Sequence, residues 1–240
     1  MKKIMLVFSF VTVVVLALIS FNGLNAEASD LDKVAQKDIQ KLDKSEQVKI
    51  QKYENLHGLN ERAATEDEVK KINEEIEKRL KTNNNVKVRD VLIDLGLEDV
   101  GYEEAKSSTL SDSPNTYEYI DDNSSINTNA FNIGSFYFRN ASHNSTYLKA
   151  TLYISNIGFT KLDSTYGWVT PYTKASNGAW IKNGANDYFS KTKLRVGTTS
   201  LGKYSAKHSN RGAKLTASGY IIDKGKVVTL NPASVIYNAR

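Results

Sequence analysis

The segment Tyr147-Leu-Lys-Ala-Thr-Leu-Tyr-Ile-Ser-Asn156 decides the fold class of this chain. Every second side chain from Leu148 to Ile154 is apolar, and the side chains between them are mostly polar. A period of two predicts a β-strand that has one face against a core and the other face in water. Similar alternation recurs through residues 131–240, so we expect this region to be an antiparallel β domain.

The predicted β domain contains seven short strands. They lie at residues 131–139, 145–157, 167–172, 193–198, 213–222, 226–230 and 234–238. Segments rich in Asn, Gly and Ser separate them, and Asp223-Lys-Gly225 is typical of a tight hairpin between two strands. Short strands without a helical period between them favour an antiparallel all-β sandwich or barrel. Because helical patterns precede this region, the predicted fold class is α+β.

The chain begins with a pattern typical of an export signal. Two lysines precede an uncharged apolar run that ends near Phe21, and Ala26-Glu-Ala28 supplies small residues where a signal peptidase acts. Residues 1–28 are therefore predicted to be a signal peptide, cleaved after Ala28. An uncleaved anchor is the alternative, since the run approaches the roughly 20 residues that span a bilayer. The lysine-rich leader and the absence of cysteine are typical of a bacterial protein, secreted as an extracellular or cell-wall-associated protein.

Residues 29–106 carry helical patterns. Thr65-Glu-Asp-Glu68 is a capping box ahead of an apolar stripe at helical spacing. A weaker helical pattern precedes Gly58, and a short helix near 88–95 is expected to end at Gly96, a typical C-cap residue. The apolar stripes are narrow, so these helices are expected either to form a small bundle or to pack on the β domain.

The charge of the chain separates by segment. The helical region, with 15 basic and 19 acidic residues, is predicted to be acidic. Residues 107–130 contain four acids and no base, and their Ser, Asn, Asp and Thr predict a polar flexible linker. Within it, Tyr117-Glu-Tyr-Ile120 is a candidate for a short edge strand. Residues 131–240 carry 15 basic and three acidic residues, a net of +12, which suggests that the two regions do different work.

The basic residues of the β domain concentrate in one stretch. The candidate anionic-surface patch comprises Lys182, Lys191, Lys193, Arg195, Lys203, Lys207, Arg211 and Lys214. A surface of one sign attracts polyanions. For an exported protein these are anionic cell-wall polymers or anionic membrane surfaces, with nucleic acid the partner that is not favoured. Lysines that only maintain solubility and keep strand edges unpaired are the alternative.

Four aromatic residues are candidate contacts for the same ligand: Trp168, Tyr172, Trp180 and Tyr188. Aromatic rings stack on sugars and anchor at lipid headgroups, because one end of the side chain is apolar and the other tolerates water. The alternative for both tryptophans is simple filling of the domain core.

Sequence motifs of catalysis are missing, and no catalytic residue, metal ligand or cofactor is predicted. The chain has no cysteine, no nucleophile elbow, no zinc-binding His-Glu-x-x-His and no phosphate-binding loop. The expected function is therefore non-enzymatic binding of an anionic cell-surface polymer or membrane surface, with the acidic helical region docking on the basic domain. The alternatives are a bacteriocin-like, membrane-active toxin and a metal-independent hydrolase of a polyanion built on His143 and His208.

Overall fold

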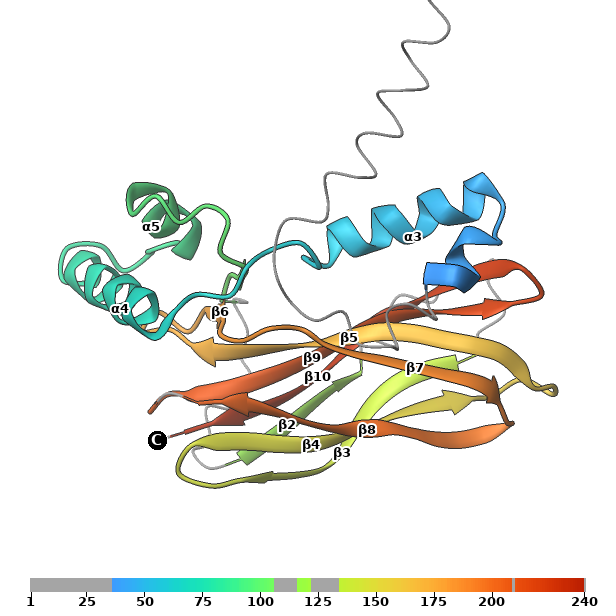
Figure 1. Cartoon of the computed structure of the whole chain (residues 1–240). Helices are drawn as coiled ribbons and strands as arrows, with labels where there is room; N and C mark the ends of the chain where they lie inside the picture. Colours follow the sequence, from blue (N-terminus) through green and yellow to red (C-terminus); the bar gives the residue numbers. More distant parts are fainter. Residues whose placement is uncertain (1–35, 106–115, 122–133, 209, 240) are drawn as a thin grey trace, which may run out of the picture.

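The computed structural model describes residues 36–105, 116–121, 134–208 and 210–239 of the chain. In this part, antiparallel strands predominate and a few short helices accompany them, so the fold is α+β and rich in β structure (Figure 1). The predicted signal peptide lies outside the described residues, as does most of the predicted linker.

The helices named among the described residues are α3 (Lys44–Leu56), α4 (Glu66–Leu80) and α5 (Val88–Asp94). Helix α4 begins where its capping box predicts it, with Thr65 as the N-cap residue. The Thr65 hydroxyl accepts the amide of Glu68, and the Glu68 carboxylate accepts the amide of Thr65, which completes the predicted capping box. Gly96 follows α5 with a φ of 67°, a conformation that suits glycine after a helix end.

The strands form two antiparallel sheets. The large sheet has the order β1-β6-β5-β9-β10-β2, and β7 also pairs with β5; the small sheet has the order β3-β4-β8. The strands are β1 (Tyr102–Glu103), β2 (Thr116–Asp121), β3 (Gly134–His143), β4 (Tyr147–Asn156), β5 (Leu162–Lys174), β6 (Trp180–Lys182), β7 (Asp187–Leu194), β8 (Gly197–Lys207), β9 (Gly212–Asp223) and β10 (Lys226–Asn238).

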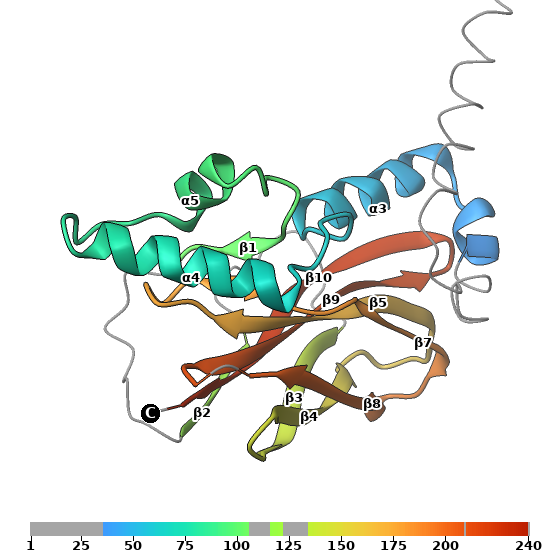
Figure 2. The ribbon, with the colours of Figure 1, turned by 60° about the vertical axis from the view of Figure 1, so that its left-hand side comes forward.

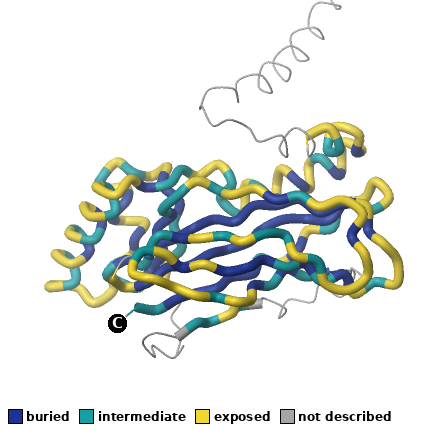
Figure 3. The backbone as a smooth tube through the Cα atoms, turned by 60° about the horizontal axis from the view of Figure 1, so that its bottom comes forward, coloured by how far each residue is buried: buried dark blue, intermediate teal, exposed yellow. Residues whose placement is uncertain are grey.

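The main core lies between the two sheets. Leu148, Leu152 and Ile154 of β4 are fully buried and share one apolar cluster with Leu215 and Val235 of the large sheet. The alternation that predicted β4 therefore corresponds to one buried row and one outward row. Figure 3 shows the strands mostly buried, whereas the outer sides of the helices and the connecting loops are exposed.

Helix α3 packs on the outer face of the large sheet, on the side away from the small sheet (Figure 1). The Tyr53 hydroxyl donates to the Leu230 carbonyl at 2.6 Å and accepts the Gly219 amide at 3.1 Å. Leu230 lies at a β-bulge in β10, where the ladder to β9 is interrupted. Tyr53 also meets the Trp168 ring edge to face, with ring centroids 6.0 Å apart. The helix therefore forms one hydrogen bond with each of the two strands beside the bulge.

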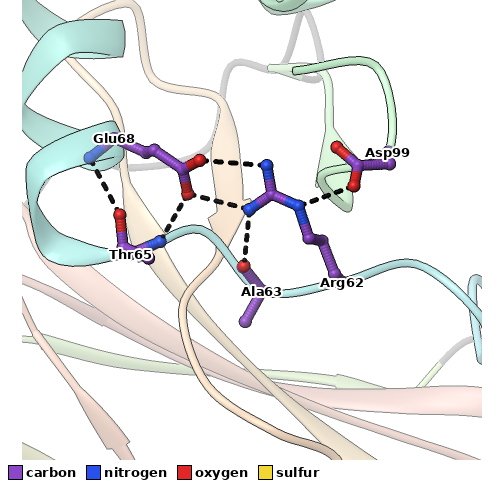
Figure 4. A network of polar contacts seen from close by, with 5 residues as sticks. All are labelled: Arg62, Ala63, Thr65, Glu68 and Asp99. Carbon is purple, nitrogen blue, oxygen red and sulfur yellow. Dashed lines mark hydrogen bonds and ion pairs between the residues drawn. The ribbon is translucent and has the colours of Figure 1, made fainter. Parts of the chain in front are cut away.

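Helices α4 and α5 form a second small core with the end of the large sheet near β6 (Figure 2). Arg62, in the segment between α3 and α4, holds this region together. Its guanidinium donates to both carboxylate oxygens of Glu68, at 2.8 and 3.0 Å, and to Asp99 at 2.6 Å (Figure 4). These bonds raise the pKa of Arg62, and the Arg62 bond lowers the pKa of Glu68 to about 2.

Several predicted strand boundaries were right and others were wrong. The hairpin at Asp223-Lys-Gly225 is confirmed: its two turn residues both have positive φ, 49° and 72°, as a tight hairpin requires. The edge strand at Tyr117-Glu-Tyr-Ile120 is present as β2, paired with β10. The predicted strands 226–230 and 234–238 are one strand, β10, divided by the bulge.

The predicted strand 193–198 was wrong, because it spans the turn between β7 and β8. Lys193 and Gly197 flank this turn with φ angles of 56° and 96°. The fully buried residues of these strands are few and irregularly spaced: Phe189 and Leu194 on β7, and Ala206 on β8. A clear period of two is therefore missing from this part of the sequence. The basic segment 203–214 belongs largely to β8 and β9.

Candidate functional site

The eight basic residues of the predicted patch divide into two sets. One set, here called the paired set, contacts the helical region and comprises Lys182, Lys207, Arg211 and Lys214. Lys207 forms an ion pair with Glu66 and Lys214 with Glu103. Arg211 pairs with Glu77 at 2.7 Å, and the Lys182 ammonium donates to the Glu61 carbonyl. These four residues are therefore engaged by the acidic part of the chain.

Two members of the paired set lie inside the protein. Lys182 is 3% exposed and Lys214 is 6% exposed, so the expectation that they belong to a surface patch is corrected. Burial lowers the pKa of Lys182, and the nearby Glu61 carboxylate acts in the opposite direction. Both residues serve the contact between the helical region and the large sheet.

The other set, here called the open set, comprises Lys191, Lys193, Arg195 and Lys203. All four side chains are exposed, and none forms an ion pair with another described residue. They lie on β7, on β8 and at the turn between them. These four residues thus lie on two consecutive strands, β7 of the large sheet and β8 of the small sheet, and on the turn that joins them.

The outer face of the small sheet extends the open set. Thr151 of β4 lies opposite Arg139 on one side and Lys203 on the other, which makes a row across three strands. Lys149 is exposed on the same outward row of β4. Strands β3, β4 and β8 contain no Asp or Glu. We call this surface, Arg139 and Lys149 together with the open set, the open basic region.

Two tyrosines on this face escaped the sequence analysis. The rings of Tyr137 and Tyr153 stack with centroids 5.5 Å apart and an interplanar angle of 13°. The guanidinium of Arg139 lies 5.1 Å from the centre of the Tyr137 ring. The period-two patterns of β3 and β4 place both tyrosines on the outward face. Their stacking could not be predicted, because it depends on the register that pairs Tyr137 with Tyr153.

An apolar tip lies at one end of the two-sheet assembly. Ile157, Phe159 and Val196 are 58%, 102% and 55% exposed, respectively. They belong to the loop after β4 and the turn after β7, which lie together because Asn156 pairs with Gly197. The exposed cations Lys161 and Arg195 are in the same two segments. This combination of apolar and cationic side chains was not predicted.

The predicted aromatic contacts are mostly buried. Trp168 is 2%, Tyr172 6% and Trp180 8% exposed, so the expectation that they contact a ligand on the open surface is corrected, and Trp168 packs beneath α3. Tyr188, on β7, is 45% exposed and lies in the same strand as Lys191. Desolvation on burial raises the pKa of Tyr172.

A cavity of about 560 Å³ lies on the outer face of the large sheet, beside the C-terminal end of α3. Tyr172, Trp180 and Lys214 line it together with residues from the helical region. Among these is Glu61, whose pKa is raised chiefly by burial, with a further contribution from Glu103. Sequence analysis missed this site because its walls come from two distant parts of the chain.

The structure brings His143 and His208 to the same tyrosine. The His143 ring stacks on the Tyr237 ring at 4.0 Å, and the His208 ring meets it edge to face at 5.4 Å. His143 also contacts the Tyr117 hydroxyl at 2.7 Å, whereas His208 contacts the Asn144 carbonyl at 2.7 Å. Among the described residues, no group of three or more His, Cys, Asp or Glu side chains is arranged to hold a metal ion.

These features define a β-rich α+β protein that has one face covered by acidic helices and another face basic and open. In the part of the chain that the structure describes, no helix is long and apolar enough to cross a membrane. No protein-family model matches the sequence, and no curated protein matches it at a significant level.

Proposed function

We propose that the protein is an exported, non-enzymatic binder of an anionic cell-surface polymer, and that the open basic region is its binding surface. The observation that carries the proposal is the contrast between four predicted cations that the helical region engages and four that stay exposed without an ion pair among the described residues. Unpaired charge of one sign raises the local concentration of a polyanion and its rate of association.

The composition of the surrounding strands supports this proposal. Arg139 and Lys149 add two exposed cations on strands without a single acid. The Tyr137–Tyr153 stack adds aromatic surface beside them, as is common where a ligand combines charge with sugar or other flat groups. The acidic helices neutralise the paired set only, so the molecule keeps a basic surface although its helical region is acidic.

The test is cosedimentation of the full chain with purified cell-wall sacculi, before and after chemical removal of their anionic polymers. We expect the protein to sediment at low salt, to be released at high salt, and to stay in solution with stripped sacculi, because salt screens exposed charges. Sedimentation that does not depend on either salt or the anionic polymer would overturn the proposal.

A second candidate is association with an anionic membrane surface, which the apolar tip favours. Phe159 is fully exposed, and Ile157 and Val196 are more than half exposed, beside Lys161 and Arg195. Apolar side chains that insert at the headgroup level, flanked by cations, are a recurrent means of binding anionic bilayers. This candidate includes the membrane-active toxin as its extreme form.

Flotation with vesicles of anionic phospholipid separates the two candidates. If the membrane is the partner, the protein floats with anionic vesicles, and Phe159→Ser reduces flotation while sacculus binding is unchanged. Release of an encapsulated dye would indicate a toxin. If Phe159→Ser has no effect on flotation, the tip does not insert and the membrane candidate fails.

A further inference from the structure

The cavity on the outer face of the large sheet offers a second binding site, remote from the open basic region. Its floor is formed by β5, β9, β10 and β2, and its walls come from the end of α3 and the segment around β1. The open basic region lies on the small sheet and on β7 with the turn after it, and none of its residues lines the cavity. This site is therefore independent of the proposed function.

The floor of the cavity is polar where a covered sheet face is normally apolar. Beneath α3, the outward residues of the large sheet include Trp168 and Tyr220, which pack against the helix. Further along the same face they change to hydroxyl-bearing residues: Thr170 lies opposite Thr216, and Thr216 lies opposite Ser234. Register therefore aligns three hydroxyl side chains in one row across three strands, and all three line the cavity.

The hydroxyl row has a hydrogen-bond donor left over. Thr216 and Ser234 are 9% and 7% exposed, and their hydroxyl oxygens lie 3.0 Å apart. In a bond between two hydroxyls, one O–H donates and the other oxygen accepts, so the accepting residue keeps its own hydrogen. No other hydrogen bond of these two hydroxyls occurs among the described residues. Because a buried donor is stabilised by an acceptor, the cavity is suited to a ligand that carries one.

The charges around the cavity disfavour an anion. Glu103 is neutralised by Lys214, and Glu104 accepts the backbone amides of Val88 and Arg89 at the start of α5. Glu61 and Glu118 remain as lining carboxylates with no hydrogen bond to their side chains in the described residues. The cations near them are the lining residue Lys174 and the buried Lys182, which interacts electrostatically with Glu61. A carboxylate accepts hydrogen bonds from several hydroxyl groups at once.

The Glu61 carboxylate occupies space that two glycines leave clear. A β-carbon on Gly58 would approach Glu61 to 2.4 Å, and one on Gly101 would approach it to 2.7 Å. Contacts that short do not occur in folded proteins, so any larger residue at either position would displace the carboxylate. The two glycines therefore leave room for this acceptor at the cavity wall.

We propose that this cavity binds a neutral saccharide of one or two sugar rings. Its volume of about 560 Å³ is within the range of roughly 300–1,000 Å³ that small-molecule sites occupy. Each sugar hydroxyl both donates and accepts, which matches a row of hydroxyls that has a spare donor beside carboxylate acceptors. Aliphatic surface from Ile120 and Ile236 lines the same floor and suits the apolar faces of a sugar ring.

The experiment is saturation-transfer NMR and titration calorimetry on the full chain with maltose, cellobiose and chitobiose. Glucose, glucosamine and glucose 6-phosphate are the single-ring probes. They carry no charge, a positive charge and a negative charge, respectively. We expect at least one neutral disaccharide to bind, and glucose 6-phosphate to bind more weakly than glucose. Preferential binding of glucosamine or glucose 6-phosphate, or no binding by any of the neutral sugars, would overturn the proposal.

The decisive variant is the double substitution Thr216→Val with Ser234→Ala. It removes both hydroxyls of the pair and keeps much of their shape, a change that is often nearly neutral for stability. We expect about a tenfold loss of affinity for the neutral sugar with the unfolding midpoint retained. If the double variant folds poorly, Glu118→Gln on the surface of β2 is an independent test, and it should also reduce the affinity for the neutral sugar. Lys203→Ala, in the open basic region, is the matched control and should leave the sugar affinity unchanged. Full retention of sugar affinity in both cavity variants would contradict the assignment of the cavity as a saccharide site.

Discussion

The paired set and the open set are composed of the same two residue types in one stretch of sequence, yet they occupy opposite environments. Lys182 and Lys214 are 3% and 6% exposed and contact the helical region, whereas Lys203 and its neighbours in the open set are exposed. The difference lies in which parts of the sheets the helical region approaches. It contacts β6, β9 and the last residue of β8, Lys207, whereas the open set lies on β7, at the turn after it and further back along β8. The net charge of a segment is therefore a poor guide to the charge of its surface.

The two sets can be compared most directly by replacing one lysine of each set with alanine and measuring the loss of stability. Lys182→Ala removes a buried side-chain stem and the hydrogen bond to the Glu61 carbonyl, so we expect a loss of about 2–3 kcal/mol of unfolding free energy. Lys203→Ala should change the unfolding free energy by less than about 0.5 kcal/mol. Urea denaturation of both variants measures the difference. Equal effects would show that burial does not distinguish the two sets.

Within the paired set, the ion pairs should differ in strength according to burial. The Lys214 side chain is 7% exposed, whereas Arg211 and its partner Glu77 are 43% and 51% exposed. A double-mutant cycle for Lys214 and Glu103 should give a coupling of about 1–2 kcal/mol, reduced by the partial exposure of Glu103. The cycle for Arg211 and Glu77 should give less than about 0.5 kcal/mol. A larger coupling at the exposed pair would contradict this ranking.

Acid should weaken the helical region that gives the paired set its partners. The Arg62 bond lowers the folded-state pKa of Glu68 to about 2 from an ordinary value of 4.5. Its stabilising contribution is thus present above pH 4.5 and is lost as the pH falls from 4.5 toward 2. Asp38 and Glu46 also have lowered pKa values, whereas the raised pKa of Glu61 acts in the opposite direction.

The measurement is the urea midpoint of the wild type and of Glu68→Gln between pH 6 and pH 3. The wild type should lose stability over this range, and the variant should start lower and fall less steeply, because it lacks the carboxylate that titrates. Parallel curves for the two proteins would show that the Arg62–Glu68 contact does not control the response to acid.

The smallest effect on stability is expected from the open set. The combined variant Lys191→Ala, Arg195→Ala and Lys203→Ala removes three exposed charges that form no ion pair with described residues. Each substitution should shift the unfolding free energy by less than about 0.5 kcal/mol, and relief of mutual repulsion can make the sum slightly stabilising. Thermal unfolding followed by circular dichroism provides the check; a marked drop in the midpoint would reveal a structural role.

The sequence predicted the parts of the fold that rest on local patterns. Alternation from Leu148 to Ile154 gave β4, the Thr65–Glu68 capping box gave the start of α4, and the turn before Lys226 gave a hairpin. The bounds of β7 and β8 could not be predicted, because their buried residues are few and irregularly spaced: Phe189 and Leu194 on β7, and Ala206 on β8. Local patterns carry little information where the buried residues of a strand do not follow a period of two.

The division of the basic patch could not be predicted, because it depends on contacts between distant residues. Lys207 meets Glu66 across 141 positions, and Lys214 meets Glu103 across 111 positions. The cavity has the same origin: Glu61 contributes to its wall, whereas most of its floor comes from strands in the second half of the chain. The sequence shows the charges of both regions. Only the fold shows which of the predicted cations are exposed and which contact the helical region.

The measurement that most directly tests the account compares two charge-matched variants in binding to anionic vesicles and to anionic sacculi. One carries Lys191→Ala, Arg195→Ala and Lys203→Ala, and the other carries Lys52→Ala, Lys71→Ala and Lys81→Ala on the exposed side of the helical region. Each basic residue near an anionic surface contributes about 1 kcal/mol, so the first variant should bind about 100-fold more weakly at low salt. The second should bind like the wild type. An equal loss in both would show that net charge, and not the open basic region, governs binding.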